Sequence, residues 1–142
     1  CPKCLYRAEQ KGSLLPRSHT CPYCGAETEA IGPLWMGPLQ DKEIISSLLE
    51  KLPSMQFGTA KQMDKLLSQL LREPETCSFY DYHVVSRNLR VSPPAMDEML
   101  DGLNDLGYYT VRTHFSVTGI KTTAPLHVIE AWILAWNKER NL

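Results

Sequence analysis

The chain has 142 residues and a formal net charge of −1, and 43% of its residues are hydrophobic while 22% are charged. This composition is typical of a globular protein and excludes a disordered tail, and no apolar run approaches the roughly 20 residues that a membrane-spanning helix needs. The middle of the chain is acidic, with seven basic against eleven acidic residues between positions 31 and 110, so we expect at most weak non-specific nucleic-acid binding by this chain alone.

The first motif is a pair of Cys-x-x-Cys knuckles separated by sixteen residues. Its cysteines, which could place four thiolates around one tetrahedral ion, are Cys1, Cys4, Cys21 and Cys24. The segment between the knuckles has too few apolar residues for a core, so we expect it to fold only around a metal. Two disulfides are the alternative, but the fifth cysteine, Cys77, makes the count odd and favours structural zinc. His19 could replace a ligand, although the four-cysteine set is complete without it.

Residues 31–40 follow as an extended strap, because two Gly-Pro pairs exclude a helix. Apolar residues at helical spacing then predict a first helix from a cap at Asp41 to Pro53. The same spacing predicts a second helix from a cap at Thr59 to Arg72. We expect the apolar stripes of both helices to lie in the core.

The next elements predict a helix-turn-helix. Phe79-Tyr80 is a candidate edge strand, and Asp81 caps a third helix that continues through Leu89. Ser92 is then the expected cap of a fourth helix, with two prolines in its first turn, which ends at Gly107. A helix, a tight turn and a second helix form the helix-turn-helix arrangement.

Residues 108–115 and 120–123 have strand propensity on either side of a turn, and together they predict a hairpin. After a helix-turn-helix such a hairpin forms a wing. A last helix opens at Pro125, and its wide apolar face includes Trp132 and Trp136. This face predicts docking, either onto this domain or onto another.

The predicted fold class is therefore α+β and mostly helical, with a four-cysteine zinc module at 1–30, the strap at 31–40 and a winged-helix-like domain at 41–142. The sequence contains no Gly-rich phosphate loop, no paired carboxylates in an apolar setting and no nucleophile–base set whose spacing indicates catalysis. Four thiolates fill a zinc shell and leave no open position, so the metal site is expected to be structural.

A binding function fits better, but the fourth helix would repel phosphate because it has four acidic residues and no Lys or Arg. The wing differs, since strand alternation places aromatic and cationic groups on one face, as backbone contact and stacking on RNA require. Two arginines late in the third helix extend this patch or simply favour the helix C-terminus. The residues assigned to RNA contact are Arg112, His114, Lys121, Tyr108, Arg87 and Arg90. A solvated strand face or an interdomain salt-bridge surface is the alternative, which the pattern alone favours slightly.

Several longer blocks resemble a known family. Besides the knuckles they are Gly32-Pro33-Leu34-Trp35-Met36-Gly37-Pro38-Leu39, Phe57-Gly58-Thr59-Ala60-Lys61, Val91-Ser92-Pro93-Pro94, Arg112-Thr113-His114-Phe115, Gly119-Ile120-Lys121-Thr122 and Ala124-Pro125-Leu126. Over nearly the whole chain their order resembles the C-terminal region of the tRNA guanine N2,N2-dimethyltransferase family. Thr123 stands where an acidic residue is expected in that family, which keeps a divergent paralogue open as an alternative.

The resemblance implies a parent enzyme that uses S-adenosylmethionine to methylate N2 of a guanine near the junction of the D and anticodon stems of tRNA. Its methyltransferase domain, which would bind the S-adenosylmethionine, is expected N-terminal to Cys1, because the chain begins on a metal ligand and not on methionine. The resemblance carries over the four cysteines as zinc ligands, and Arg112, His114 and Lys121 as positions facing tRNA or that domain. It implies an intracellular protein of the nucleus or the mitochondrion. A protein-interaction module without RNA contact, using the face of Trp132 and Trp136, is the competing class.

Overall fold

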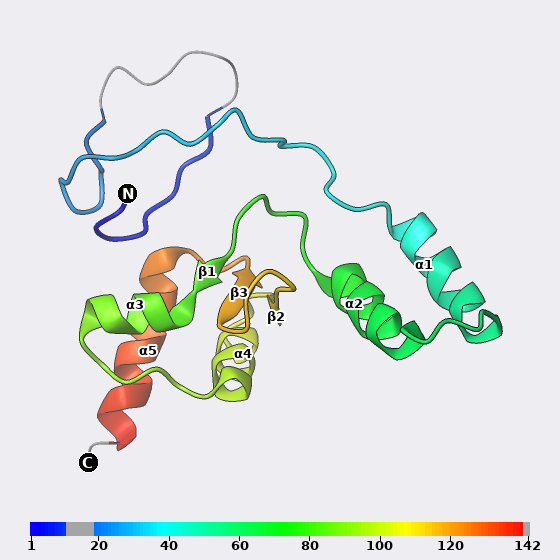
Figure 1. Cartoon of the computed structure of the whole chain (residues 1–142). Coiled ribbons are helices and arrows are strands. Elements are labelled where there is room, and N and C mark those ends of the chain that lie inside the picture. The colour runs from blue at the N-terminus through cyan, green and yellow to red at the C-terminus, as the bar shows by residue number, and fades with distance from the viewer. Residues whose placement is uncertain (11–18, 141–142) are drawn as a thin grey trace. The chain divides into compact units, whose positions relative to one another are not determined.

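The computed structural model describes residues 1–10 and 19–140. It contains two compact units, Cys1–Trp35 and Met36–Leu142, whose elements are labelled in Figure 1. The elements are α1 (Lys42–Lys51), the 3-10 helix η1 (Leu52–Ser54), α2 (Ala60–Arg72), β1 (Tyr80–Asp81), α3 (Tyr82–Leu89), α4 (Met96–Asp105), β2 (Thr110–Arg112), β3 (Gly119–Thr122) and α5 (Leu126–Arg140). The α+β class is confirmed. Among the described residues, no helix is long and apolar enough to cross a membrane.

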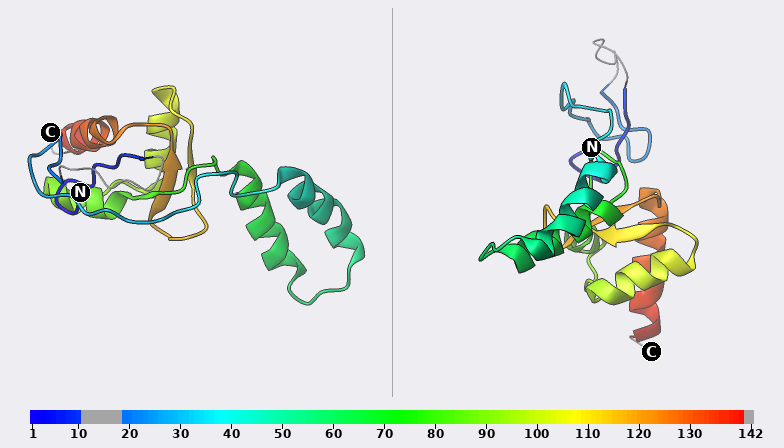
Figure 2. Two further views of the ribbon diagram at one scale, coloured as in Figure 1. Left: turned by 90° about the horizontal axis from the view of Figure 1, so that it is seen from above. Right: turned by 90° about the vertical axis from the view of Figure 1, so that its right-hand side faces the viewer.

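Helices α1 and α2 pack side by side as a hairpin (Figure 2). The predicted cap at Asp41 is confirmed, because its carboxylate accepts hydrogen bonds from the amides of Glu43 and Ile44 at 3.1 and 3.0 Å. Thr59 precedes α2 as expected, but its hydroxyl contacts the Met63 sulfur at 3.7 Å and makes no cap hydrogen bond.

The expectation that both apolar stripes lie in the core is wrong for this hairpin. Helix α2 has no buried residue, and the exposed apolar side chains of the two helices are Ile44, Leu48, Met63 and Leu66. Each helix has only the other to cover it within the pair, so one side of each stripe stays exposed. Ile45 is the buried residue of α1.

The three strands form an antiparallel sheet in the order β1-β3-β2. The edge position predicted for the first strand is confirmed, with Tyr80 opposite Ile120 and Asp81 opposite Gly119. Asp81 also caps α3 as predicted, because its carboxylate accepts hydrogen bonds from the amides of His83 and Val84 at 3.0 and 3.2 Å.

Helix α5 packs against both α3 and α4 (Figure 1). The core between these elements is apolar. Its buried side chains include Val85, Met99, Leu103, Ile120, Ile129 and Ile133. The indole of Trp132 lies so close to α4 that a Cβ added at Gly102 would be 2.1 Å from it. The guanidinium of Arg140 lies 4.7 Å from the Trp136 ring. The tryptophan face thus packs within its own domain, which was one of the two predicted outcomes.

The predicted start of the fourth helix at Ser92 is wrong. Helix α4 begins at Met96 after Ala95, whose amide donates to the carboxylate of Glu98 at 3.0 Å. Ser92 and Pro93 each precede a proline, and the residue before a proline is disfavoured in helical conformation. The carbonyl of Ser92 instead accepts a hydrogen bond from the Asn137 side chain at 2.8 Å, which ties the α3–α4 turn to α5.

Candidate metal centre and nucleic-acid interface

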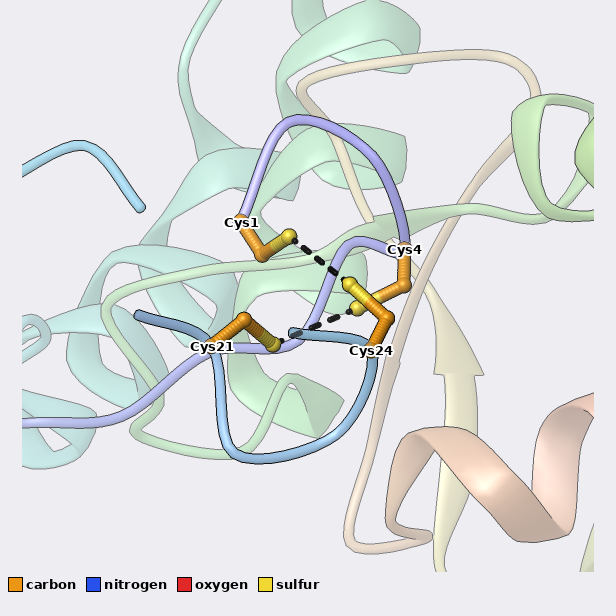
Figure 3. A group of neighbouring side chains, drawn as sticks. All are labelled: Cys1, Cys4, Cys21 and Cys24. Carbon is orange, nitrogen blue, oxygen red and sulfur yellow. Dashed lines mark hydrogen bonds between the residues drawn. The ribbon is translucent and has the colours of Figure 1, made fainter. Parts of the chain in front are cut away.

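The four cysteines of the knuckles converge on one point, as Figure 3 shows. All four sulfur atoms lie within 4.8 Å of one another, and the pairs Cys1–Cys24 and Cys4–Cys21 are 3.6 Å apart. A tetrahedral zinc ion with Zn–S bonds of 2.3 Å requires sulfur atoms about 3.8 Å apart. The donor set therefore fits zinc or a similar thiophilic ion, and it leaves no ligand position for water. His19 is not a member of this cluster.

Each knuckle is closed by a turn that returns to its first cysteine. The amides of Leu5 and Gly25 donate to the carbonyls of Cys1 and Cys21, both at 2.9 Å. Both residues have left-handed backbone conformations, with φ of 65° and 72°. Glycine adopts this conformation freely, whereas leucine there costs about 1–2 kcal/mol. The second knuckle thus has the residue its turn favours, and the first does not.

The thiols of the cluster differ in acidity. Burial raises the pKa of Cys4 to about 11. Burial acts in the same direction on Cys21, but hydrogen bonds from the backbone of Cys24 and Tyr23 outweigh it, and the pKa of Cys21 is lowered. Cys21 is 1% exposed, so its sulfur would be a buried anion when ionised. A bound cation would compensate that charge.

Lys121, which was predicted to contact RNA, is buried in this structure. Its side chain is 1% exposed, and its ammonium lies 3.1 Å from a carboxylate oxygen of Glu73, which is itself 0% exposed. The prediction from strand alternation required one face of the hairpin to be exposed to solvent. However, β3 is the central strand, and three of its four residues are buried. A cation in this position cannot reach a phosphate.

His114 shares the same carboxylate. Its backbone amide and its Nδ1 atom lie 2.6 and 2.9 Å from Oε1 of Glu73. Burial alone would raise the pKa of Glu73, but the side-chain and backbone hydrogen bonds from His114, together with Lys121, hold it below its usual value. The side chain of His114 is 26% exposed. Glu73, His114 and Lys121 are called the Glu73 hub below.

Sequence reasoning missed Glu73. This residue directly follows α2, and its contacts with His114 and Lys121 join α2 to the β2–β3 hairpin. Nothing local marks it, since Arg72-Glu73-Pro74 reads as an ordinary charged helix end. The hydroxyl of Tyr109 adds a second tie by donating to the carbonyl of Arg72 at 2.6 Å.

The other predicted wing residues do not form one face. Arg112 is exposed, but its guanidinium lies 2.7 Å from the carboxylate of Asp97. Tyr108 is half-buried and precedes β2, and its amide donates to the Leu103 carbonyl at 3.0 Å. Of these two predicted contacts, Arg112 is therefore neutralised by its own chain and Tyr108 is partly covered by it.

Arg87 and Arg90 are placed differently. Both are exposed at the end of α3, and neither belongs to an ion pair among the residues that the structure describes. They line one open pocket together with His83, which sequence reasoning missed although it precedes Arg87 by four residues on the predicted third helix.

Comparison with known proteins identifies the family to which this chain is similar. The model of the family described as N2,N2-dimethylguanosine tRNA methyltransferase matches residues 1–134. A tRNA (guanine(26)-N(2))-dimethyltransferase of Methanocorpusculum labreanum is 63% identical over 137 residues, which cover 96% of this chain and 36% of the relative. The enzyme of the same description from Methanoculleus marisnigri is 44% identical over 130 residues, covering 92% and 35%.

A solved structure is also similar. It is that of Trm1 from Pyrococcus horikoshii in complex with S-adenosyl-L-methionine, with a TM-score of 0.67 and 39% sequence identity. The similarity covers 72% of this chain and 28% of that one. The chain thus spans about a third of the length of the curated relatives it matches.

Proposed function

The chain belongs to the N2,N2-dimethylguanosine tRNA methyltransferase family, and we propose that it is the tRNA-engaging part of an S-adenosylmethionine-dependent enzyme that methylates N2 of a guanine. The family match over residues 1–134 carries this proposal. The target guanine would lie near the junction of the D and anticodon stems.

The proposed division of labour assigns the cofactor to the rest of the protein. Within residues 1–10 and 19–140, no strand leads into a helix through a glycine-rich turn of the kind that holds such cofactors. S-adenosylmethionine, bound by the rest of the protein, would supply the methyl group. This chain would hold the tRNA so that the target guanine, flipped from its stack, reaches the cofactor.

Zinc is the proposed structural ion of the knuckles, supported by the convergence of Cys1, Cys4, Cys21 and Cys24 within 4.8 Å. Metal analysis of the full-length protein should give one zinc per chain. Chelation should unfold the knuckle unit, because apart from Cys21 little among its described residues is buried. A metal-free protein of unchanged stability would contradict the proposal.

A winged-helix-like body is proposed for the α3–α5 region. Two features support it: α3 and α4 lie between β1 and the β2–β3 hairpin in the chain, and β3 is the central strand of the sheet. The wing would serve to connect α2 to the body, since its cations are paired internally.

The exposed apolar side of the α1–α2 hairpin is proposed to contact the remaining two-thirds of the protein. Ile44, Leu48, Met63 and Leu66 are all exposed there, and α2 has no buried residue. Leu66→Lys in the full-length protein should lower its thermal stability, whereas Lys65→Glu on the exposed side of the same helix should not. Equal melting temperatures of the Leu66→Lys variant and wild type would contradict this contact.

Photocrosslinking tests the tRNA-engaging role directly. Full-length protein bound to tRNA that contains 4-thiouridine would be irradiated, digested and mapped by mass spectrometry. We expect crosslinked peptides from residues 79–123 as well as from the catalytic part. Crosslinks confined to sequences outside this chain would favour the competing protein-interaction module.

A further inference from the structure

The pocket at the end of α3 does not include the predicted wing contacts Arg112, His114 and Lys121, although Thr118 of the β2–β3 turn lines it. It is open, has a volume of about 740 Å³, and is lined by residues of α3 and of the turn that leads to α4. Its polar lining includes His83, Arg87, Arg90 and Ser92. Two of these side chains, Arg87 and Arg90, are cations, as the binding of an anionic ligand requires.

The cations of the α3–α5 body differ in whether a carboxylate already neutralises them. Arg112, Arg140 and Lys121 lie 2.7, 2.6 and 3.1 Å from Asp97, Glu98 and Glu73. Arg87 and Arg90 have no such partner among the described residues. A phosphate would therefore meet an uncompensated charge at the α3 pocket and a compensated one at the wing.

One carboxylate, Asp81, also lines the pocket. Its Oδ1 accepts from the amides of His83 and Val84, and its Oδ2 accepts from the Thr118 hydroxyl at 2.8 Å. It caps the opposite end of α3, about 13 Å from Arg90 at 1.5 Å per residue. Asp81 thus acts as a cap at the far end of α3, and the end of the pocket that holds the arginines has no carboxylate among its lining residues.

The backbone of Arg90 gives an independent observation. The residue has a left-handed conformation, with φ of 60° and ψ of 39°. The amides of Arg90 and Val91 donate back to the carbonyls of Arg87 and Ser86 at 3.0 and 3.1 Å, which closes α3 in a Schellman-type turn. Glycine is the ordinary residue there, and another L-residue costs about 1–2 kcal/mol. Local folding therefore does not explain an arginine at this position.

The backbone on which Arg87 and Arg90 stand is packed against the rest of the domain. Val85 and Ser86 of α3 are buried, and the Asn137 side chain of α5 donates to the carbonyl of Ser92. Binding a ligand there would therefore order side chains but would not need to order the backbone.

We propose that the α3 pocket binds the phosphate backbone of the tRNA, with the guanidinium groups of Arg87 and Arg90 on phosphate oxygens and the Ser92 hydroxyl as a further donor. Guanidinium groups match phosphate geometry in two parallel hydrogen bonds. The contact positions the RNA and reads no sequence. The inference rests on the proposed function, and it names the residues that would make the tRNA contact.

Arg90→Gly tests the proposal without loss of stability, because glycine relieves the left-handed backbone while removing the guanidinium. We expect the full-length variant to melt at or above the temperature of wild type and to bind a tRNA transcript about five- to tenfold more weakly. The slope of log Kd against log salt should fall by about one. Arg87→Ala should lower the tRNA affinity and the salt slope by similar amounts. Arg112 is the matched control, because it is an exposed arginine that Asp97 already neutralises. The Arg112→Ala protein should bind tRNA like wild type.

Two results would overturn different claims. If wild type binds tRNA and Arg90→Gly and Arg87→Ala bind it with the same affinity and salt slope, the α3 pocket is not a phosphate site, and the proposed function stands. If full-length wild type binds no tRNA, the proposed function itself fails. If Arg112→Ala loses as much tRNA affinity as Arg90→Gly and Arg87→Ala do, the phosphate contact is not specific to the α3 pocket and includes the wing.

Discussion

The wing and the α3 pocket contain the same kinds of side chain in opposite electrostatic situations. At the wing, Lys121 and His114 converge on the buried carboxylate of Glu73, and Arg112 lies against Asp97. At the α3 pocket, Arg87 and Arg90 are exposed and unpaired among the described residues. Basic residues in a sequence thus serve the fold where the chain itself supplies the counter-charge, and they remain available to a polyanion where it does not.

Removal of the Glu73 charge should give the largest effect. Glu73→Gln leaves the ammonium of Lys121 buried without a counter-charge, and breaking a buried ion pair from one side typically costs about 3–5 kcal/mol. We expect a loss of this order in the free energy of unfolding, measured by denaturant titration of the full-length protein. Glu75→Gln, at an exposed position two residues later, is the control and should change little.

Lys121→Met in the Glu73→Gln background should recover part of the loss, since an apolar side chain of similar length replaces the unpaired cation. A Glu73→Gln protein as stable as wild type would show that the hub does not hold the wing, and Lys121 would again be a candidate for contact outside the chain.

The predicted elements were correct where local chemistry decides. Asp41 and Asp81 are followed by helices because their carboxylates accept the first amides, and the edge strand and the final helix follow from equally local patterns. The convergence of the four cysteines was likewise predictable, since metal spacing is a local signal. These features need no knowledge of distant partners.

The wing contacts were not predictable in the same way. Glu73 and Lys121 are 48 positions apart, and no periodicity relates the end of a helix to the central strand of a sheet formed later. The buried state of Lys121 depends on that encounter, so alternation within one strand predicted the wrong accessibility. The exposed apolar side of α1 and α2 shows the same limit, because the periodicity is evident but the surface that covers it is not.

The acid dependence of stability should sharpen the difference between the two regions. The pKa of Glu73 lies below its usual value of 4.5, because hydrogen bonds from His114 and the nearby Lys121 outweigh burial. The stabilisation from this carboxylate is therefore fully present at a pH above 4.5, the usual pKa. It is lost as the pH falls through the lowered pKa of Glu73 in the folded protein. The stability difference between wild type and Glu73→Gln should narrow as the pH falls below about 4.5.

Variants of the α3 pocket provide the contrast, since Arg87→Ala leaves the Glu73 hub intact and should follow the wild-type acid profile. A Glu73→Gln difference that stays constant down to the acid transition would mean that the carboxylate is not the stabilising group.

The exposed pair of Arg112 and Asp97 should give the smallest effect. Their side chains are 51% and 82% exposed, and ion pairs of this kind contribute about 0–1 kcal/mol because solvent screens them. In a double-mutant cycle with Arg112→Ala and Asp97→Ala, we expect a coupling energy below about 1 kcal/mol and unchanged tRNA affinity of the Arg112→Ala protein.

Asp97→Ala leaves the guanidinium of Arg112 without its counter-charge, so this variant tests more sharply whether pairing keeps the wing from tRNA. If pairing is what keeps the wing from tRNA, its release should strengthen tRNA binding slightly and steepen the salt dependence, whereas unchanged binding would mean that the wing lies away from the RNA whatever its charge.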